Sequence, residues 1–171
     1  MVGWVLPSSR FLVNEVLKQI DYDKAKVIVE YGPGVGAFTT RLLERMRPDA
    51  KLIALELNPE FYGYLASSLK DPRLHLVNES AAEIDVVLSR LGLAQVDYIV
   101  SGIPFKTIPD PVREQIVRKT HSVLGLDGSF LVYQFSTAVL PYLERVFGRV
   151  SRGFELRNIL PARLFYCARS A

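Results

Sequence analysis

Residues 27–39 read Val27-Ile28-Val29-Glu30-Tyr31-Gly32-Pro33-Gly34-Val35-Gly36-Ala37-Phe38-Thr39, and this stretch decides the fold. A run of β-branched residues ends in an acidic side chain, a glycine-rich turn follows, and a helix begins. An α/β sheet forms a nucleotide pocket in this way, at the carboxyl end of its first strand. The glycines let the backbone turn sharply and let a ligand approach without meeting a Cβ atom.

The glycine spacing admits two kinds of nucleotide. Gly32, Gly34 and Ala37 fit the dinucleotide fingerprint G-x-G-x-x-G/A. The acidic residue Glu30, followed by Gly32-x-Gly34-x-Gly36, resembles instead the first motif of class I S-adenosylmethionine-dependent methyltransferases. A carboxylate at the turn repels a pyrophosphate and attracts the ammonium group of methionine. The stretch therefore favours the methyl donor S-adenosyl-L-methionine.

A second carboxylate follows at the end of the next apolar run, Leu52-Ile53-Ala54-Leu55-Glu56. It lies close to the offset of about 20 residues expected of an acidic residue that binds ribose hydroxyls. A carboxylate has two acceptor oxygens and can bind both hydroxyls of a ribose diol. Glu56 is therefore the expected ribose ligand.

Length and composition predict one domain. The chain has 171 residues, 49% of them hydrophobic, which is enough material for one core. No apolar run reaches the ~18–20 residues of a membrane span. The single cysteine, Cys167, fits a reducing compartment, so we expect a cytoplasmic protein. No group of His, Cys, Asp and Glu has metal-ligand spacing, and we expect no metal.

The charge is unevenly distributed along the chain. The net charge is +3, and residues 141–171 hold six arginines against two glutamates. These arginines either lie on solvated strand faces or form a basic edge that meets lipid phosphate or nucleic acid.

Apolar runs and helical periodicities alternate from residue 26 onward, which predicts a parallel, doubly wound sheet. We expect a single-domain Rossmann-like α/β fold, with a seven-stranded, mostly parallel sheet, an antiparallel last strand, and helices on both faces. The expected strands are 26–31, 51–56, 73–77, 96–101, 129–136, 149–159 and 162–169. The expected helices are 36–46, 59–69, 81–91, 110–124 and 138–147. Gly125 and Gly128 are expected to bracket the turn into the fifth strand.

We expect an N-terminal segment at residues 1–24 and an S-adenosylmethionine-dependent methyltransferase domain at residues 25–171. Ser8 or Ser9 is a plausible helix N-cap. The following apolar residues recur at helical spacing: Phe11, Leu12, Val16, Leu17 and Ile20. This helix either packs on the sheet or, together with Trp4, covers the acceptor side and contacts the membrane surface.

The acceptor is expected beside Ser101-Gly102-Ile103-Pro104-Phe105, after the fourth strand. Methyl transfer is an in-line displacement, so this loop must position the nucleophile and exclude water. The ribosomal-RNA adenine dimethyltransferases resemble this chain in the glycine motif and hold Asn-Leu-Pro-Tyr here. Aligned on Pro104, Gly102 replaces the asparagine that holds the adenine amino group, while Phe105 keeps the aromatic ring. This difference argues against an adenine acceptor.

Five segments together resemble the bacterial phospholipid N-methyltransferases, over about residues 7–169. They are Pro7-Ser8-Ser9-Arg10-Phe11-Leu12, Glu30-Tyr31-Gly32-Pro33-Gly34-Val35-Gly36, Glu56-Leu57-Asn58-Pro59, Ser101-Gly102-Ile103-Pro104 and Tyr133-Gln134-Phe135. The resemblance implies methylation of the amine of phosphatidylethanolamine, stepwise towards phosphatidylcholine. It also implies a monomer, peripheral to the inner face of an anionic membrane, with no nucleic-acid partner.

The resemblance also implies roles for matching residues. Those expected at the donor are Ser9, Arg10, Glu30, Tyr31, Gly32, Gly34, Gly36, Glu56, Leu57, Ser80, Ala81 and Ser101. Ser80 holds the place of the acidic residue that accepts from the adenine amino group in relatives. Those expected around the reacting amine are Ser101, Gly102, Ile103, Pro104 and Tyr133. Phe105, Tyr133, Gln134, Arg157 and Arg163 are expected to bind the substrate, the arginines through the lipid phosphate.

Three alternatives stay open. The acceptor could be a soluble small amine or hydroxyl compound, or an adenine N6 in RNA or DNA. The chain could also bind the methyl donor without catalysis, as a sensor or partner subunit.

Overall fold

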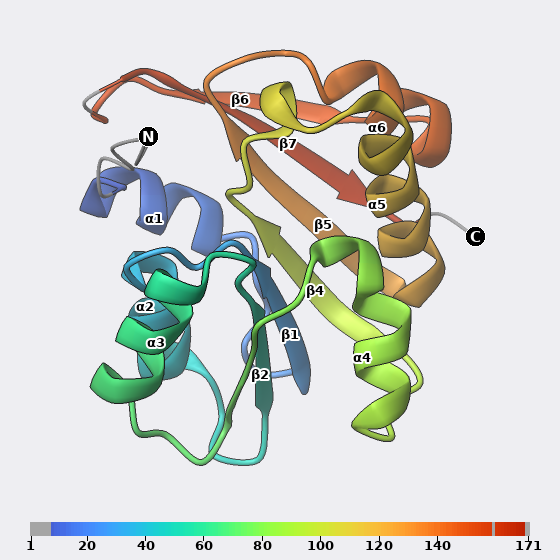
Figure 1. Ribbon diagram of the computed structural model, residues 1–171. Helices are drawn as coiled ribbons and strands as arrows, with labels where there is room; N and C mark the ends of the chain where they lie inside the picture. The colour runs from blue at the N-terminus through green and yellow to red at the C-terminus, as the bar shows by residue number, and fades with distance from the viewer. Residues whose placement is uncertain (1–7, 159, 170–171) are drawn as a thin grey trace.

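The computed structural model describes residues 8–158 and 160–169. Its centre is a seven-stranded sheet in the order β3-β2-β1-β4-β5-β7-β6 (Figure 1). The strands are β1 (Val27–Tyr31), β2 (Lys51–Leu55), β3 (Leu74–Val77), β4 (Val96–Ser101), β5 (Leu124–Gln134), β6 (Ser151–Glu155) and β7 (Ala162–Ala168). Among these strands, β7 alone runs in the direction opposite to the other six. It lies between β5 and β6, one place inside the edge. The expected mostly parallel sheet with an antiparallel last strand is confirmed.

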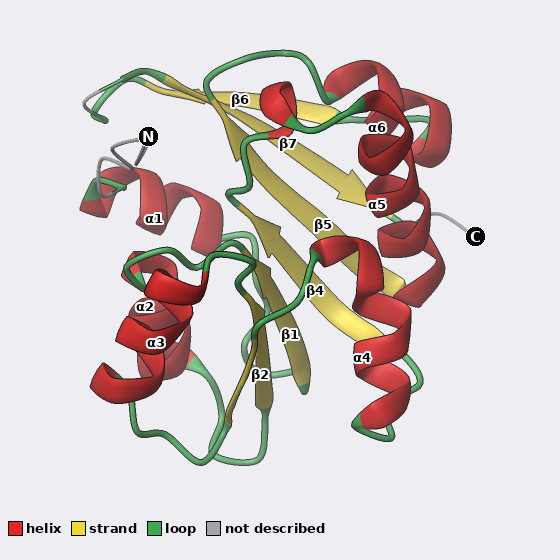
Figure 2. Cartoon of the chain, viewed as in Figure 1, coloured by secondary structure: helices red, strands yellow, loops and turns green. Residues whose placement is uncertain are grey.

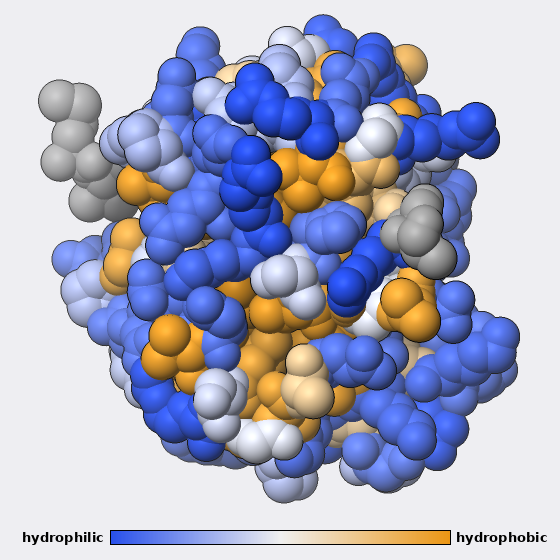
Figure 3. Space-filling view, turned by 90° about the vertical axis from the view of Figure 1, so that its right-hand side faces the viewer, coloured by the Kyte–Doolittle hydropathy of each residue, from blue (hydrophilic) through white to orange (hydrophobic). Residues whose placement is uncertain are grey.

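Helices cover both faces of the sheet (Figure 2). They are α1 (Arg10–Leu17), α2 (Ala37–Arg45), α3 (Pro59–Ser68), α4 (Ile84–Arg90), α5 (Asp110–Val123) and α6 (Leu140–Phe147), with 3₁₀ turns at Ala81–Glu83 and Phe105–Thr107. One hydrophobic cluster joins the sheet to α4, α5 and α6, and a second joins it to α1 and α2. Because both faces are covered, β1 is apolar along almost its whole length, as expected for a parallel sheet. Seen from the side of α5 and α6, charged and polar side chains alternate with apolar patches (Figure 3).

The start of β5 differs from the expected turn. The strand begins directly at Leu124, where α5 has just ended. Val96 of β4 pairs with Leu124, whereas Tyr98 pairs with Ser129, so a bulge absorbs the segment that contains Gly125 and Gly128. Two glycines in a strand weaken its regular ladder, and a bulge accommodates them without a break in the sheet.

The helix α1 packs on the sheet. Its side chains Leu12, Val13, Val16 and Leu17 are buried against β-strand residues such as Leu131 and Leu164. The apolar face of this helix is therefore used in the core and is not available to a membrane. Trp4, the other part of the expected membrane contact, lies outside the described residues. No helix among residues 8–158 and 160–169 combines the length and apolarity that crossing a membrane requires.

Candidate active site

The glycine loop after β1 adopts a backbone that favours glycine. Gly32, Gly34 and Gly36 have φ angles of 70°, 57° and 84°, in the left-handed region. A Cβ atom on Gly32 would lie 2.7 Å from Cγ2 of Ile103, so the glycine loop packs directly on the acceptor loop. A Cβ atom on Gly34 would meet no described atom within 4 Å. The space over Gly34 is therefore open to a ligand.

Glu56 stands beside this open space and supports the loop. Its side chain is 6% exposed, and Oε2 accepts a hydrogen bond from the Gly34 N–H at 2.9 Å. Oε1 accepts from the Asn58 N–H at 2.8 Å. A carboxylate offers about four lone-pair positions, so two remain for a ribose diol. Asn78, which the sequence patterns did not single out, donates to the Glu56 carbonyl at 2.7 Å and fixes this turn.

Glu30 lies under the loop and is 3% exposed. Burial raises the pKa of its carboxyl group from 4.5 to about 8, although the Thr39 hydroxyl, which donates to Oε2 at 2.8 Å, acts in the opposite direction. The negative charge of Glu56 adds to the rise. A cation placed near Glu30 would favour its ionised form, which suits the ammonium end of the methyl donor.

These features fit S-adenosyl-L-methionine. The open space over Gly34 leaves room for the donor to lie against the backbone of the loop. Glu56 has acceptors for the ribose, and Glu30 suits the methionine ammonium. Leu57 is 68% exposed directly after Glu56, as an adenine contact requires.

Tyr31 fits the donor site less well, because its side chain is fully buried on the opposite face, where its hydroxyl pairs with Thr120 at 3.1 Å. Tyr31 contributes only its backbone, whose carbonyl accepts from the Gly102 N–H at 3.1 Å.

The residues expected at the adenine end form the turn after β3. The Ser80 hydroxyl accepts from the Ala82 N–H at 3.2 Å and caps the 3₁₀ turn. A hydroxyl can accept here and still donate, so a contact to a base nitrogen is compatible with this cap. Ala81 is buried, and Glu79 forms an ion pair with Arg90 at 2.7 Å.

Ser9 and Arg10 lie at the start of α1. The Ser9 hydroxyl accepts from the Leu12 N–H at 3.2 Å as an N-cap, and it donates to the Arg157 carbonyl at 2.9 Å. Both bonds hold α1 in place. Arg10 is exposed and lines a hollow of about 310 Å³ between α1 and α2.

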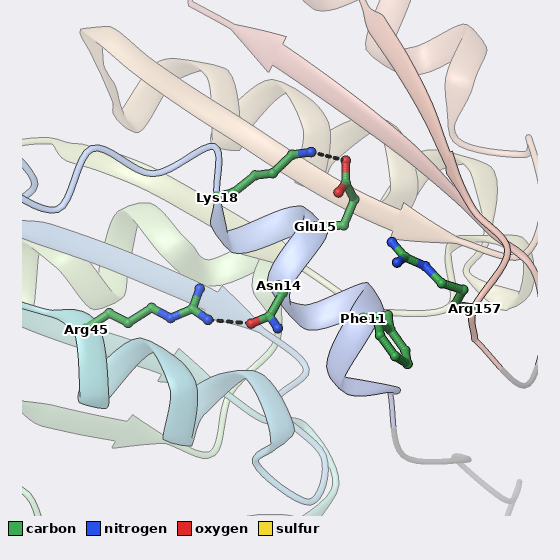
Figure 4. A pocket seen from close by; sticks show the side chains of 6 residues that line it. All are labelled: Phe11, Asn14, Glu15, Lys18, Arg45 and Arg157. Carbon is green, nitrogen blue, oxygen red and sulfur yellow. Dashed lines mark hydrogen bonds and ion pairs between the residues drawn. The ribbon is translucent and has the colours of Figure 1, made fainter.

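A larger hollow of about 470 Å³ lies on the outer side of α1 (Figure 4). Its lining residues are Phe11, Asn14, Glu15, Lys18, Arg45 and Arg157. Lys18 is paired with Glu15 at 2.6 Å, and Arg45 donates to the Asn14 side chain. This hollow borders the carboxyl end of α2, whereas the glycine loop is at its amino end, so it is distinct from the donor site.

Tyr133 occupies the space above Gly102. A Cβ atom on Gly102 would lie 1.9 Å from the Tyr133 hydroxyl oxygen and 2.3 Å from Cζ, closer than any real contact. The Tyr133 ring stacks on Phe38, with 4.5 Å between ring centroids and 10° between planes. Burial and the nearby Glu30 charge raise the pKa of the phenol, so the hydroxyl stays protonated. The Tyr133 hydroxyl thus fills the space that a side chain on residue 102 would need, so the glycine at 102 and the tyrosine at 133 depend on each other.

The structure changes the expected roles of two acceptor residues. Phe105 is fully buried in the cluster under α5, so its ring faces away from the acceptor and cannot stack on a substrate. Gln134 is buried as well, and its Nε2 donates to the Ile103 carbonyl at 2.8 Å. Gln134 therefore positions the acceptor loop. Ser101 is buried and Pro104 is exposed at the two ends of that loop.

The two arginines expected at a lipid phosphate lie on opposite faces of the β6–β7 hairpin. Arg157 donates to both carboxylate oxygens of Glu155, at 3.0 and 3.1 Å, and its guanidinium is 4.8 Å from the centre of the Phe11 ring. Ala162 and Leu164 belong to the cluster under α1, so Arg163 between them faces the other side, 5.8 Å from the Phe154 ring. One headgroup approaching one face of the hairpin meets one of these arginines.

The sheet and the donor site define a class I S-adenosylmethionine-dependent methyltransferase. Residues 7–140 match the ribosomal RNA adenine dimethylase family, and the chain belongs to this family. Among solved structures, precorrin-6y C5,15-methyltransferase from Geobacter metallireducens GS-15 has a similar fold, with a TM-score of 0.78. The two chains are 17% identical, and the similarity covers 100% of this chain and 93% of the other.

Relatives in sequence include enzymes with lipid and with RNA substrates in their names. An ornithine lipid N-methyltransferase from Singulisphaera acidiphila is 29% identical over 168 residues, covering 97% of this chain and 88% of the relative. A ribosomal RNA small subunit methyltransferase A from Ureaplasma urealyticum serovar 10 is 30% identical over 163 residues, covering 89% of this chain and 52% of the relative. The same-named protein of Mycoplasma capricolum is 27% identical, with 57% and 39% covered. The chain thus spans about half or less of these RNA methyltransferases.

Proposed function

We propose that this chain transfers the methyl group of S-adenosyl-L-methionine to the primary amine of a lipid headgroup. Phosphatidylethanolamine is the proposed acceptor, methylated stepwise towards phosphatidylcholine. An ornithine lipid is the second candidate, and the similarity to an ornithine lipid N-methyltransferase over 97% of the chain favours it. Both candidates present a primary amine on a chain-bearing lipid. The enzyme works as a monomer at the inner face of an anionic membrane and does not need nucleic acid.

The observation that carries the proposal is the contact between Tyr133 and Gly102. With the phenol hydroxyl placed where a Cβ atom on residue 102 would lie, the loop has no room for an amide that holds adenine. The aromatic residue that would stack on a base, Phe105, is fully buried. Neither base contact of the RNA enzymes is therefore available. A slender alkyl amine needs neither contact.

The chain's task in this reaction is positioning. When bound, the donor supplies a methyl group that is already activated as a sulfonium substituent. The acceptor must present a neutral amine, although an alkyl ammonium has an ordinary pKa of about 10.4. A site that excludes water lowers this pKa, because it disfavours the charged form. The Tyr133 hydroxyl, held by Phe38, can accept a hydrogen bond from the amine and direct its lone pair at the methyl carbon. Methyl transfer would form a C–N bond as the S–C bond breaks, giving a methylated ammonium, which would lose its proton to solvent once it leaves the water-excluding site.

The test supplies three acceptors with radiolabelled donor. These are vesicles with phosphatidylethanolamine, vesicles with ornithine lipid, and ribosomal RNA. Label in a lipid fraction supports the proposal, and the number of labelled lipid species counts the methyl groups added. At donor concentrations below saturation, the variant Glu56→Ala should strongly reduce the label, whereas Glu60→Ala, on the exposed first turn of α3, should not.

Two outcomes would contradict the lipid proposal. Label in RNA alone would assign the chain to adenine methylation despite the Tyr133 contact. No label in lipid or RNA, with donor binding intact by calorimetry, would move the acceptor to a soluble amine or hydroxyl compound, or show a donor-binding protein without catalysis.

A further inference from the structure

Exposed apolar side chains gather at the edge of the sheet that holds the active site. Ten large apolar side chains are exposed in the described part of the chain, and seven of them lie at this edge or beside it. They are Phe11, Val35, Leu57, Phe135, Phe154, Leu156 and Leu160. The other three, Tyr64, Val86 and Leu126, are scattered over α3, α4 and the opposite edge. Such a one-sided distribution is typical of an interaction surface.

The apolar side chains are most concentrated at the β6–β7 tip, which we define as Phe154, Leu156 and Leu160 with Arg157. β6 runs parallel to β5 and β7 returns antiparallel, so the turn between them projects from the carboxyl edge (Figure 1). Asn158 Oδ1 accepts from the Ser9 N–H at 2.8 Å, and this bond ties the tip to α1. Three exposed apolar side chains on a short, anchored turn form a small protrusion.

The tip is coupled to the acceptor loop through β7 and β5. Arg163 pairs in register with Phe154 of β6 on one side and with Gln134 of β5 on the other. Gln134 in turn donates to the Ile103 carbonyl at 2.8 Å. If the tip binds a surface, this rigid link therefore also fixes the distance between that surface and the acceptor loop.

Three arginines lie at the apolar tip or next to it. Arg157 is paired with Glu155, and Arg163 pairs in register with Phe154. The guanidinium groups of Arg10 and Arg157 lie 5.0 and 4.8 Å from the centre of the Phe11 ring. Arginine side chains lay their apolar stems along a surface and keep the guanidinium at the level of lipid headgroups. Apolar side chains with cations beside them match an anionic bilayer interface.

We propose that the β6–β7 tip docks this chain on an anionic lipid bilayer, with Phe154, Leu156 and Leu160 inserted among the acyl chains. This inference rests on the proposed function for its choice of partner. It assigns membrane contact to the hairpin, since the apolar face of α1 is already buried in the core. Docking in this orientation brings the carboxyl edge of the sheet, and with it Tyr133 and Gly102, close to the headgroups.

Vesicle binding tests the proposal with a matched pair of variants. Leu156 is 69% exposed at the tip and Leu126 is 66% exposed at the opposite edge, so Leu156→Asp and Leu126→Asp change charge and exposed apolar area alike. Affinity for vesicles of phosphatidylcholine with phosphatidylglycerol should fall at least about tenfold for Leu156→Asp, from the loss of one buried leucine. It should stay within about twofold for Leu126→Asp. Replacing the vesicles by phosphatidylcholine alone should weaken binding of the unaltered chain by roughly fivefold for each arginine engaged.

Insertion itself can be read with an environment-sensitive dye. Cys167 is buried and burial raises the pKa of its thiol to about 12, so it resists labelling. Dye on Leu160→Cys should shift to the blue and gain intensity with anionic vesicles, and dye on Leu126→Cys should not. Both variants should retain donor binding by calorimetry.

Three results would overturn the docking proposal. They are equal vesicle affinity for the two aspartate variants, no change in the Leu160→Cys dye, or loss of self-association in Leu156→Asp, which would make the tip an interface between copies. Because these readouts measure binding, they are independent of methyl transfer. Vesicle binding without lipid methylation would leave the docking surface standing while the proposed acceptor fails.

Discussion

The donor half and the acceptor half of the site are built in different ways. The donor half, at the ends of β1 and β2, consists of glycine backbone and two buried carboxylates that are hydrogen-bonded to Gly34, Asn58 and Thr39. The acceptor half, at the ends of β4 and β5, consists of a glycine without a side chain and a tyrosine from the neighbouring strand that fills its space. We therefore expect the donor half to recognise its ligand by charge and hydrogen bonds, and the acceptor half by shape.

This difference suggests where the choice of acceptor could be made. We expect the donor contacts, which come from backbone and carboxylates, to be independent of the acceptor. We expect the pair Gly102 and Tyr133, in which the phenol fills the space over the loop after β4, to act on the acceptor. Changes in the donor half should therefore act on donor binding and stability, and changes in the acceptor half on turnover.

The largest effect is expected from the buried charge of the donor half. The pKa of Glu30 is about 8 in the folded chain against an ordinary value of 4.5, so the folded state holds a proton that the unfolded state releases. The free energy of unfolding should therefore fall as pH rises from about 4.5 to about 8, by roughly 5 kcal/mol. Glu30→Gln should remove this slope in denaturation series across that range. The exposed Glu60→Gln is the control, and equal slopes for both variants would show that Glu30 is ionised throughout.

Glu56→Ala should weaken donor binding about a hundredfold. The change removes the acceptors of the ribose diol and leaves the N–H groups of Gly34 and Asn58 without partners. Charge-assisted hydrogen bonds contribute about 1.5–3 kcal/mol each. Calorimetry with the methyl donor measures the loss, and Glu60→Ala is the matched control. An affinity within twofold of the unaltered chain would remove Glu56 from the donor site.

Gly102→Ala should disturb the acceptor half while leaving the donor half intact. The new methyl group meets the Tyr133 hydroxyl, and overpacking of this kind costs about 1–3 kcal/mol of unfolding free energy. Turnover should fall while donor affinity stays unchanged. Gly63→Ala is the control, because a Cβ atom there meets no described atom within 4 Å.

A double-mutant cycle sharpens this result. Combining Gly102→Ala with Tyr133→Leu removes the phenol that causes the clash, so the second change should recover most of the lost stability. Additive losses in the cycle would show that residues 102 and 133 do not share one space.

Gln134→Ala should have the smallest effect of the four. It deletes the hydrogen bond to the Ile103 carbonyl, which contributes about 1 kcal/mol, and it loosens the loop that positions the amine. We expect turnover to fall roughly fivefold, following that energy. Donor affinity measured by calorimetry should not change. Gln95→Ala, an exposed glutamine near the other end of β4, is the control. A changed donor affinity would couple the two halves through this residue.

The sheet and the donor half of the site could be predicted from the sequence. The alternation of strands and helices predicted the sheet, and the residues Glu30, Gly32, Gly34 and Glu56 predicted the methyl donor. Both succeed because the signal is local. Side-chain periodicity reports burial within one element, and a strand followed by a glycine turn has few alternative structures. The bulge at the start of β5 was missed, because glycines there suggest a turn equally well.

The acceptor half was decided only by the tertiary structure. The sequence showed that Gly102 lacks an amide, but not that Tyr133 fills the vacant space, nor that Phe105 is buried and Gln134 holds the Ile103 carbonyl. It also did not show that Arg157 and Arg163 face opposite ways. These facts depend on the pairing of β4 with β5 and of β7 with β5 and β6, which brings distant residues together. Strand register is set by packing of the whole sheet, and no local pattern in the sequence specifies it.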